Sequence, residues 1–260
     1  MRMKFNSLLS SLSALLPFAA SGALVAHYPL DTDASDASGN GYDGSVVGGS
    51  VNFGQAGANG NTGSSAAFPN QGRIDVPFNS ALNPASYTVT LWANASSTNG
   101  FASPITSRDD TPNSVHGYIL YNDNGGKWNN WTGSGGGPGS WDQLPGGPVS
   151  TDTWTHLALS YDAATNTKSF YVDGSLAGSK NTGLLYSPNG TVQSEDLHIG
   201  AGADSGGAFF FSGNIDDVSI WNTALDEAAI SNIKDNGVAS AIPEATSLGL
   251  LALGCLGLLR

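Results

Sequence analysis

The stretch WTHLALSYDAATNTKSFYVDG, residues 154–174, is the most informative part of the sequence about the fold. Its two apolar runs, Thr155–Tyr161 and Ser169–Val172, have the length and the apolar alternation of β-strands. The Asp173-Gly174 pair that follows the second run tolerates the positive φ angles of a type I′ turn. This stretch therefore predicts two strands followed by a β-hairpin.

The same pattern continues on both sides of this stretch. From residue 24 to about residue 239, short apolar runs alternate with clusters of Gly, Asn, Asp and Ser, which is typical of a sandwich of antiparallel strands. One short helix is predicted from Asp226 to about Lys234, with Gly237 near its end. Further strands are predicted at Leu24–Leu30, Ile74–Pro77, Tyr87–Ala93, Gly117–Tyr121, Leu197–Ile199 and Ile215–Trp221.

The composition narrows the class of protein and of partner. The 35 glycines among 260 residues and the 12% of charged residues argue against a charged disordered chain and against a coiled coil. The 21 acidic and 9 basic side chains give a net charge of -12, so binding to nucleic acid lacks its main electrostatic contribution. Cations and neutral ligands are the natural partners. The single cysteine, Cys255, lies in the C-terminal segment, so the folded body owes nothing to disulfides.

The two ends of the chain have the features of targeting segments, and we assign the folded domain to residues 23–239. Residues 1–22 combine Arg2 and Lys4 with an apolar run and small residues, the plan of a secretory signal peptide. In residues 240–260, the sequence Pro243-Glu244-Ala245 precedes an apolar run, 248–259, and Arg260. As a helix this run covers about 18 Å, less than the roughly 30 Å of a hydrocarbon core, which favours transient membrane association. The alternative at either end is a helix of the core.

The C-terminal segment resembles the PEP-CTERM tails that exosortase-type enzymes process in Gram-negative bacteria. The resemblance rests on the order of the Pro243-Glu244 motif, the short apolar run and the terminal Arg260. It implies an exosortase-type processing enzyme as a partner. It also implies an exported protein, at the cell surface or outside a bacterium of this type.

Between the ends, the chain resembles the LamG-like jelly-roll domains, which have the concanavalin A-like lectin/glucanase fold. The resemblance implies an all-β jelly-roll sandwich of two antiparallel sheets with one short C-terminal helix, between the hydrophobic terminal segments. The segments that carry it, in order, are Leu24–Asp31, Asp36–Gly44, Trp154–Asp162, Phe170–Gly174, His198–Gly200 and Gly213–Trp221 with Ala224-Leu225.

The loop DASGNGYDG, residues 36–44, is a candidate calcium site. Its Asp36, Asn40 and Asp43 can present oxygen atoms, the ligands that Ca²⁺ prefers, from a glycine-rich turn. The family resemblance implies that an aspartate of the last strand completes a structural calcium site, and we assign Asp216 to that role and Asp217 as the second choice. The alternative is that the loop residues only stabilise turns.

The alternation of side chains in the last strand supports the choice of Asp216. In a regular strand, Asp216, Val218 and Ile220 share one face, whereas Asp217 points to the other. If the apolar pair faces the core, the Asp216 carboxylate lies at the inner edge of the sheet, where it needs a cation or hydrogen-bond donors.

A long insertion between Arg108 and Gly147 has the composition of a carbohydrate-binding cleft. Tryptophan faces stack on sugar rings, while Arg, Asn and Asp side chains bond to sugar hydroxyls. Because Trp128 and Trp131 are three residues apart, they lie on opposite faces of a regular strand, so at most one of them forms a sugar platform. The alternative is that both complete a hairpin and cap the core. The candidate ligand-binding residues are Arg108, Asp109, Tyr121, Asn122, Trp128, Asn130, Trp131 and Trp141.

Catalytic patterns are weak in this sequence. Its three glutamates, Glu195, Glu227 and Glu244, do not form the Glu-x-Asp-x-x-Glu strand of the fold's hydrolases, and no Gly-x-Ser-x-Gly motif occurs. The leading hypothesis is a secreted or surface-associated, non-catalytic, lectin-like domain that binds glycan or extracellular polysaccharide. The alternative is an extracellular matrix or adhesion protein that binds other proteins, and a polysaccharide hydrolase or lyase is the third hypothesis.

Overall fold

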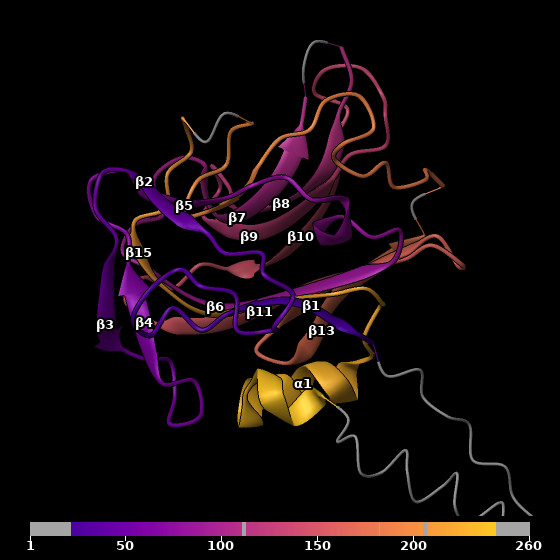
Figure 1. Ribbon diagram of the computed structural model, residues 1–260. Coiled ribbons are helices and arrows are strands. Elements are labelled where there is room, and N and C mark those ends of the chain that lie inside the picture. The colour runs from indigo at the N-terminus through magenta and orange to yellow at the C-terminus, as the bar shows by residue number, and fades with distance from the viewer. Residues whose placement is uncertain (1–21, 111–112, 182, 205–206, 243–260) are drawn as a thin grey trace, which may run out of the picture.

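Strand β6 (Tyr87–Ala95) shows how the alternating sequence builds a core. Its Val89, Leu91 and Ala93 point to one side and are buried in the main core, because successive side chains of a strand alternate between its faces. β6 lies between β11 (Trp154–Asp162) and β15 (Gly213–Trp221) and pairs antiparallel with both. Two sheets of such strands enclose the main core, as Figure 1 shows.

The first sheet has eight strands in the order β13-β12-β11-β6-β15-β4-β3, and β1 also pairs with β15. The predicted hairpin between β12 and β13 is confirmed, since Asp173 and Gly174 have φ angles of 51° and 79°. The remaining strands of this sheet are β1 (Leu24–Tyr28), β3 (Asn52–Ala56), β4 (Ser64–Ala67), β12 (Thr167–Val172) and β13 (Ser175–Asn181).

The second sheet has seven strands in the order β10-β9-β8-β7-β14-β5-β2, so β10 and β2 form its edges. The segment 108–147, which the sequence suggested to be an insertion, in fact supplies β8, β9 and β10 to this sheet. The strands are β2 (Ser45–Gly48), β5 (Gly72–Val76), β7 (Ala102–Asp109), β8 (His116–Asn122), β9 (Lys127–Thr132), β10 (Asp142–Pro148) and β14 (Leu197–Ile199).

The predicted helix is confirmed as α1 (Glu227–Asn236), which packs against the outer face of the first sheet (Figure 1). The Asp226 side chain caps its start by accepting the Ala229 N–H at 2.8 Å. Its buried Ile230 and Ile233 join a second apolar cluster with Trp221 of β15. Two short 3-10 helices, η1 (Ser80–Leu82) and η2 (Val238–Ala241), complete the elements.

A β-bulge at Asp217 interrupts the last strand. Ile215, Val218 and Ile220 all lie in the main core, although strict alternation would separate Ile215 from the other two. The pairing of β15 with β6 shifts between Asp216 and Ser219, and Asp217 has a φ angle of 51°. The prediction that Asp216 shares a face with Val218 is therefore wrong, because the extra residue reverses the alternation.

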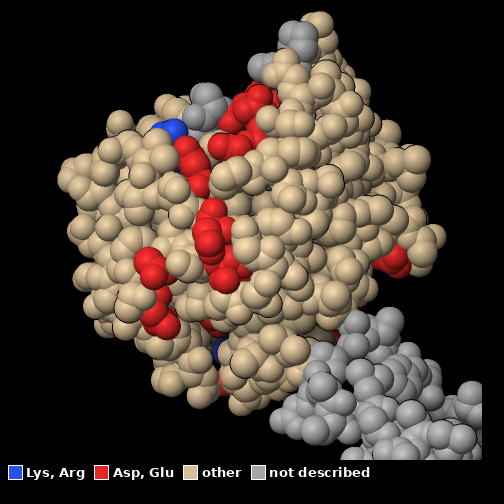
Figure 2. Space-filling view, viewed as in Figure 1, with Lys and Arg blue, Asp and Glu red and all other residues tan. Residues whose placement is uncertain are grey.

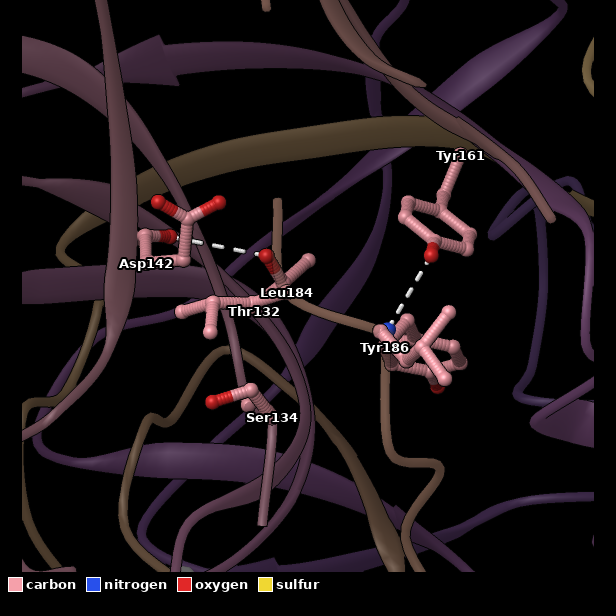
Figure 3. A pocket seen from close by; sticks show the side chains of 8 residues that line it. Thr132, Ser134, Asp142, Tyr161, Leu184 and Tyr186 are labelled. Carbon is pink, nitrogen blue, oxygen red and sulfur yellow. Dashed lines mark hydrogen bonds between the residues drawn. The ribbon is translucent and has the colours of Figure 1, made fainter. Parts of the chain in front are cut away.

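One end of the sandwich is polar inside. Lys168 of β12 is fully buried and donates to the Asn130 carbonyl at 3.4 Å and the Thr132 hydroxyl at 3.1 Å, both in the opposite sheet. Its ammonium lies 3.1 Å from the Asp142 carboxylate, and burial lowers the pKa of Lys168 to about 8. Figure 3 shows Thr132 and Asp142 in a small hollow at this end, where the Tyr161 hydroxyl accepts the backbone N–H of Tyr186 at 3.1 Å.

The computed structural model describes residues 22–110, 113–181, 183–204 and 207–242. Nearly all of the signal and tail segments predicted from the sequence lie outside the described residues. Within the described part of the chain, every helix is too short or too polar to cross a bilayer. The all-β class and the sandwich of two antiparallel sheets are confirmed, and α1 is the one α-helix among the described residues, near their C-terminal end as predicted.

Candidate functional site

Aromatic side chains meet on the outer face of the second sheet and surround a cavity of about 240 Å³, which we call the aromatic cup. Tyr121 of β8 and Trp131 of β9 belong to a cluster that is separate from the main core, because they alternate with core residues along their strands. The other aromatic residues come from connecting segments. The cup is lined by Phe101, Arg108, Asp110, Tyr121, Trp131, Gly139, Trp141 and Phe209.

The rings of the cup pack mostly edge to face. The centroids of Tyr121 and Trp131 are 5.2 Å apart with an interplanar angle of 77°, and Phe101 contacts Trp131 at 5.7 Å and 75°. This geometry is the one that aromatic quadrupoles favour. Tyr121 is only 2% exposed, whereas Phe101 and Phe209 are 37% and 38% exposed. The cup therefore has a buried, fixed floor and aromatic walls that a ligand can reach.

Arg108 fixes the floor of the cup. Its Nη1 donates to the Tyr121 hydroxyl at 2.9 Å, its Nη2 to the Asp110 carboxylate at 2.5 Å, and its Nε to the Asp204 carboxylate. The guanidinium lies 5.6 Å from the ring centroid of Trp141, within the range of a cation–π contact. Burial acts to lower the pKa of Arg108, but Tyr121 and the two carboxylates outweigh it and raise the pKa.

Asp110 and Asp204 form a hydrogen-bonded carboxyl pair. Burial, the bond to Asp204 and the charge of Asp204 raise the pKa of Asp110 to about 6, while Arg108 acts in the opposite direction. Burial also acts to raise the pKa of Asp204, but the hydrogen bonds from Asp110 and Arg108 lower it.

The segment that carries Asp204 is anchored to the sheet beneath it. The Nε2 of His198 in β14 lies 2.9 Å from the Asp204 carbonyl oxygen, and its Nδ1 lies 2.7 Å from the Asp75 carboxylate of β5. Arg73 in turn donates to Asp75 at 2.8 Å. Because His198 is only 3% exposed, this chain of contacts holds Asp204 in place from below.

Four of the eight predicted ligand-binding residues line the cup, namely Arg108, Tyr121, Trp131 and Trp141. The predicted separation of the two tryptophans is confirmed, since Trp128 lies in the main core and Trp131 on the outer face. The predicted residues that do not line the cavity are Asp109, Asn122, Trp128 and Asn130, all of which are buried.

The sequence reasoning missed three contributors to this site: Phe101, Asp204 and Phe209. They lie outside the segment 108–147, before β7 and after β14. β7 and β14 pair side by side in the sheet, and a bridge between Ser103 and Phe210 joins the two flanking segments. Only this pairing brings the three residues to the cup. Asp110 does lie within the segment, but its type and position alone did not distinguish it.

The second candidate site, the loop 36–44, is closed by its own hydrogen bonds. The Asp36 carboxylate accepts three backbone N–H groups at 2.9 to 3.1 Å, and the Asp43 carboxylate accepts the Asp36 N–H at 2.8 Å. Asn40 donates its side-chain amide to the Val25 carbonyl at 2.9 Å. Burial acts to raise the pKa of Asp36, but these bonds lower it. These bonds are typical of turn-forming side chains, and the calcium role of this loop stays a prediction.

The two aspartates of the last strand each retain a buried oxygen, Asp216 Oδ1 and Asp217 Oδ2, that has no hydrogen-bond partner among the described residues. The second oxygen of Asp216 accepts the Ala58 N–H at 2.8 Å and the Thr62 hydroxyl at 2.7 Å. Asp217 Oδ1 lies 2.6 Å from Nε2 of His27. Burial raises the pKa of Asp216 to about 7, and the nearby carboxylates add to this.

These partnerless oxygens fit a hard cation better than the oxygens of the loop 36–44 do. A buried carboxylate without donors is costly, and a cation at this position would relieve the cost. Gly57 allows the loop 57–63 to close here, since a β-carbon on it would meet the Gly63 carbonyl and lie 3.2 Å from Asp216. Within the described residues, no three His, Cys, Asp or Glu side chains converge on one point. Backbone carbonyls and water would therefore supply most ligands.

Comparison with known proteins identifies structural relatives at low sequence identity. No curated protein matches the sequence. Domain 4 of AbnA, a GH43 extracellular arabinanase from Geobacillus stearothermophilus solved in complex with arabinotriose, has a TM-score of 0.61 and 22% identity, over 82% of this chain and 99% of that one. The CBM40 of the Ruminococcus gnavus IT-sialidase, bound to α2,3-sialyllactose, has a TM-score of 0.52 and 15% identity, over 60% of this chain and 85% of that one. These similarities show a shared fold.

A third solved structure, the receptor-binding domain of a botulinum neurotoxin of C/D mosaic serotype, has a TM-score of 0.58 and 18% identity, over 82% of this chain and 51% of that one. The family model described as the concanavalin A-like lectin/glucanases superfamily matches residues 63–231, from the start of β4 into α1. The matched part includes the strands that form the cup. The chain therefore belongs to the concanavalin A-like lectin/glucanases superfamily.

Proposed function

We propose that the protein is an exported, non-catalytic carbohydrate-binding domain and that the aromatic cup is its binding site. The observation that carries the proposal is the set of aromatic rings around a cavity of about 240 Å³ on the outer face of a rigid sheet. Aromatic faces pack against the apolar C–H faces of sugars. The Asp110 side chain, 30% exposed, can accept a sugar hydroxyl.

The size of the cup limits what it can enclose. Its volume is smaller than the roughly 300–1,000 Å³ of pockets that enclose a drug-sized ligand. It can therefore hold about one sugar ring, with the rest of a chain lying along the surface. Two of the structural relatives, the arabinanase domain and the CBM40, were solved with bound oligosaccharides, which supports a glycan as the ligand. Export is proposed from the sequence of residues 1–22 and 240–260 alone.

The carboxyl pair in the cup argues against glycoside hydrolysis there. A retaining glycosidase holds its two carboxyl groups about 5–5.5 Å apart on either side of the bond to be cleaved. Asp110 and Asp204 are instead both bound to Arg108, and the Asp110 backbone N–H donates to the Asp204 carboxylate at 3.0 Å, so the two groups are held against one guanidinium and not on either side of a sugar. These carboxyl groups shape the cup and hold its floor.

We expect Trp131→Ala to weaken glycan binding at least about tenfold, because it removes a central ring of the cup. The measurement is a glycan array followed by calorimetric titration of the glycans that bind. The matched control is Trp154→Ala, which removes a partly exposed tryptophan from the first sheet, and its affinity should equal that of the wild type.

Three results would count against this proposal. Equal losses in the Trp131→Ala and Trp154→Ala variants would mean that the cup is not the site. A blank array together with self-association or protein capture would favour the adhesion alternative. Turnover of any polysaccharide by the purified protein would show that the domain is catalytic.

We also propose a structural calcium ion at Asp216 and Asp217, supported by their partnerless buried oxygens. Calcium is expected to raise the melting temperature relative to EDTA, because binding to the native state adds about 2.7 kcal/mol at a hundredfold excess over the dissociation constant. Asp216→Asn should abolish this increment. Asp36→Asn, which alters the loop 36–44, should lower the melting temperature but keep the increment. If Asp36→Asn abolished the calcium-dependent rise in melting temperature and Asp216→Asn kept it, the site would lie in the loop 36–44. Equal melting temperatures with calcium and with EDTA would show that the protein binds no structural calcium.

A further inference from the structure

We infer that the aromatic cup selects neutral sugars and rejects acidic ones, the uronic and sialic acids. The inference rests on the proposed function and adds the chemical class of the ligand. The observation behind it is that Arg108, the only cation among the described residues that line the cup, already donates to three protein groups, while the neighbouring Asp110 side chain is more exposed to a ligand.

The edge of the Arg108 guanidinium that carries Nε and Nη2 is occupied by protein carboxylates. Each of its three nitrogens donates within the protein, to Tyr121, Asp110 and Asp204. The rings of Trp141 and Phe209 also lie near it, with their centroids 5.6 and 5.8 Å from its central carbon. Recognition of a sugar carboxylate by arginine relies on two parallel N–H groups at an open edge. Here these groups are occupied by Asp110 and Asp204.

The charge that a ligand meets in the cup is negative. The Arg108 side chain is 10% exposed, whereas that of Asp110 is 30% exposed. One guanidinium faces two carboxyl groups, so the ionised cluster carries a net charge of -1. An acidic sugar entering the cup would lose water and approach Asp110 with the same sign of charge, which is unfavourable in a partly buried site. A neutral sugar would instead donate its hydroxyls to that carboxylate.

The negative charge of the protein surface also disfavours acidic sugars. The chain carries a net charge of -12, and Figure 2 shows acidic side chains in a band across one face with few basic ones among them. Such a surface repels polyanionic chains over roughly 10 Å at 0.1 M salt. Neutral polysaccharides approach it without this penalty.

The test compares oligosaccharides that differ in charge but share a backbone. Lactose is paired with 3′-sialyllactose, galactotriose with trigalacturonate, and xylotriose with its glucuronate-substituted form. Each is titrated into the full-length protein at pH 7.5 and 50 mM NaCl. In every pair for which binding is detected, we expect the neutral member to bind at least tenfold more tightly. The preference should shrink at 500 mM NaCl, because salt screens the repulsion.

The variant Asp110→Asn removes the negative charge from the cup and keeps nearly the same side-chain shape. We expect it to improve binding of each acidic member relative to its neutral partner at least tenfold, because the repulsion is lost while the amide oxygen can still accept a sugar hydroxyl. The matched control is Asp152→Asn, which makes the same change of net charge in an exposed turn where the φ angle of 54° also suits asparagine. The control should alter neither affinity.

Each remaining outcome has a defined meaning. Acidic members that bind as tightly as neutral ones, or more tightly, would overturn the charge selection and leave glycan binding intact. A preference that does not change with salt or with Asp110→Asn would also overturn it, because the discrimination would then come from shape. If no oligosaccharide in the panel or on the array binds, the proposed function fails and the selection fails with it. Circular dichroism of both variants shows whether they are folded.

Discussion

Trp128→Ala is expected to lower the free energy of unfolding by about 3–5 kcal/mol. The Trp128 side chain is fully buried in the core between the two sheets, so its removal leaves a cavity that the neighbouring strands can fill only in part. Its indole N–H has no partner among the described residues, which reduces the loss slightly. Urea unfolding at pH 7 measures the effect.

Trp131→Ala is the matched control for this experiment. Trp131 lies three residues further along β9 but on the outer face, where it is partly exposed. Its loss should lower the free energy of unfolding much less than the loss of Trp128 does. If the two variants were equally destabilised, the two side chains could not lie in the different environments that the structure gives them.

The second large effect is a loss of stability in acid, caused by His156. Its side chain is 1% exposed, and burial together with the charge of Lys234 lowers its pKa to about 3. In the unfolded chain, histidine titrates near pH 6.5. Below that pH, His156 binds a proton in the unfolded state but stays neutral in the native state. The free energy of unfolding therefore decreases as the pH falls from about 6.5 towards 3. By pH 4 the loss amounts to about 3 kcal/mol.

Variants without a titrating group at this position reveal the contribution. We expect His156→Gln and His156→Phe to flatten the dependence of unfolding free energy on pH between 7 and 4, whatever their absolute stability. The ring of His156 packs against Trp92 at 5.1 Å, so Phe preserves an aromatic contact that Gln removes. If both variants keep the slope of the wild type, another group is responsible for the acid sensitivity.

The strands that were predicted are those whose side chains point into an apolar core. β6, β11 and β15 show clear apolar runs, and the structure places them at the centre of the first sheet. β9 showed no such run, because its inward face carries the polar Asn130 and Thr132, and the Asn130 carbonyl and the Thr132 hydroxyl accept hydrogen bonds from the buried Lys168. The partner of this inward face is a lysine in the opposite sheet, so apolar alternation in the sequence does not reveal β9.

Two features of the fold limited how well the candidate sites could be predicted from the sequence: the pairing of strands distant in the chain and the bulge in the last strand. Half of the predicted ligand-binding residues reach the cup because they share one strand face or one connecting segment. Phe101 and Phe209 reach it only through the pairing of β7 with β14, which no local pattern encodes. The bulge at Asp217 could not be predicted either. One extra residue with a positive φ angle changes which side chains of the strand face the core, and the sequence carries no signal for it.

The edge strands of the second sheet are poorly suited to pairing with a strand of another molecule. An unprotected edge can add a strand from another molecule and so begin aggregation. β10 contains Pro145 and Pro148, which have no N–H to donate, and its pairing with β9 shifts between them. β2, at the other edge, is only four residues long and ends at Gly48, whose φ angle is 77°. Neither edge of this sheet is therefore a good template for adding a strand from another molecule.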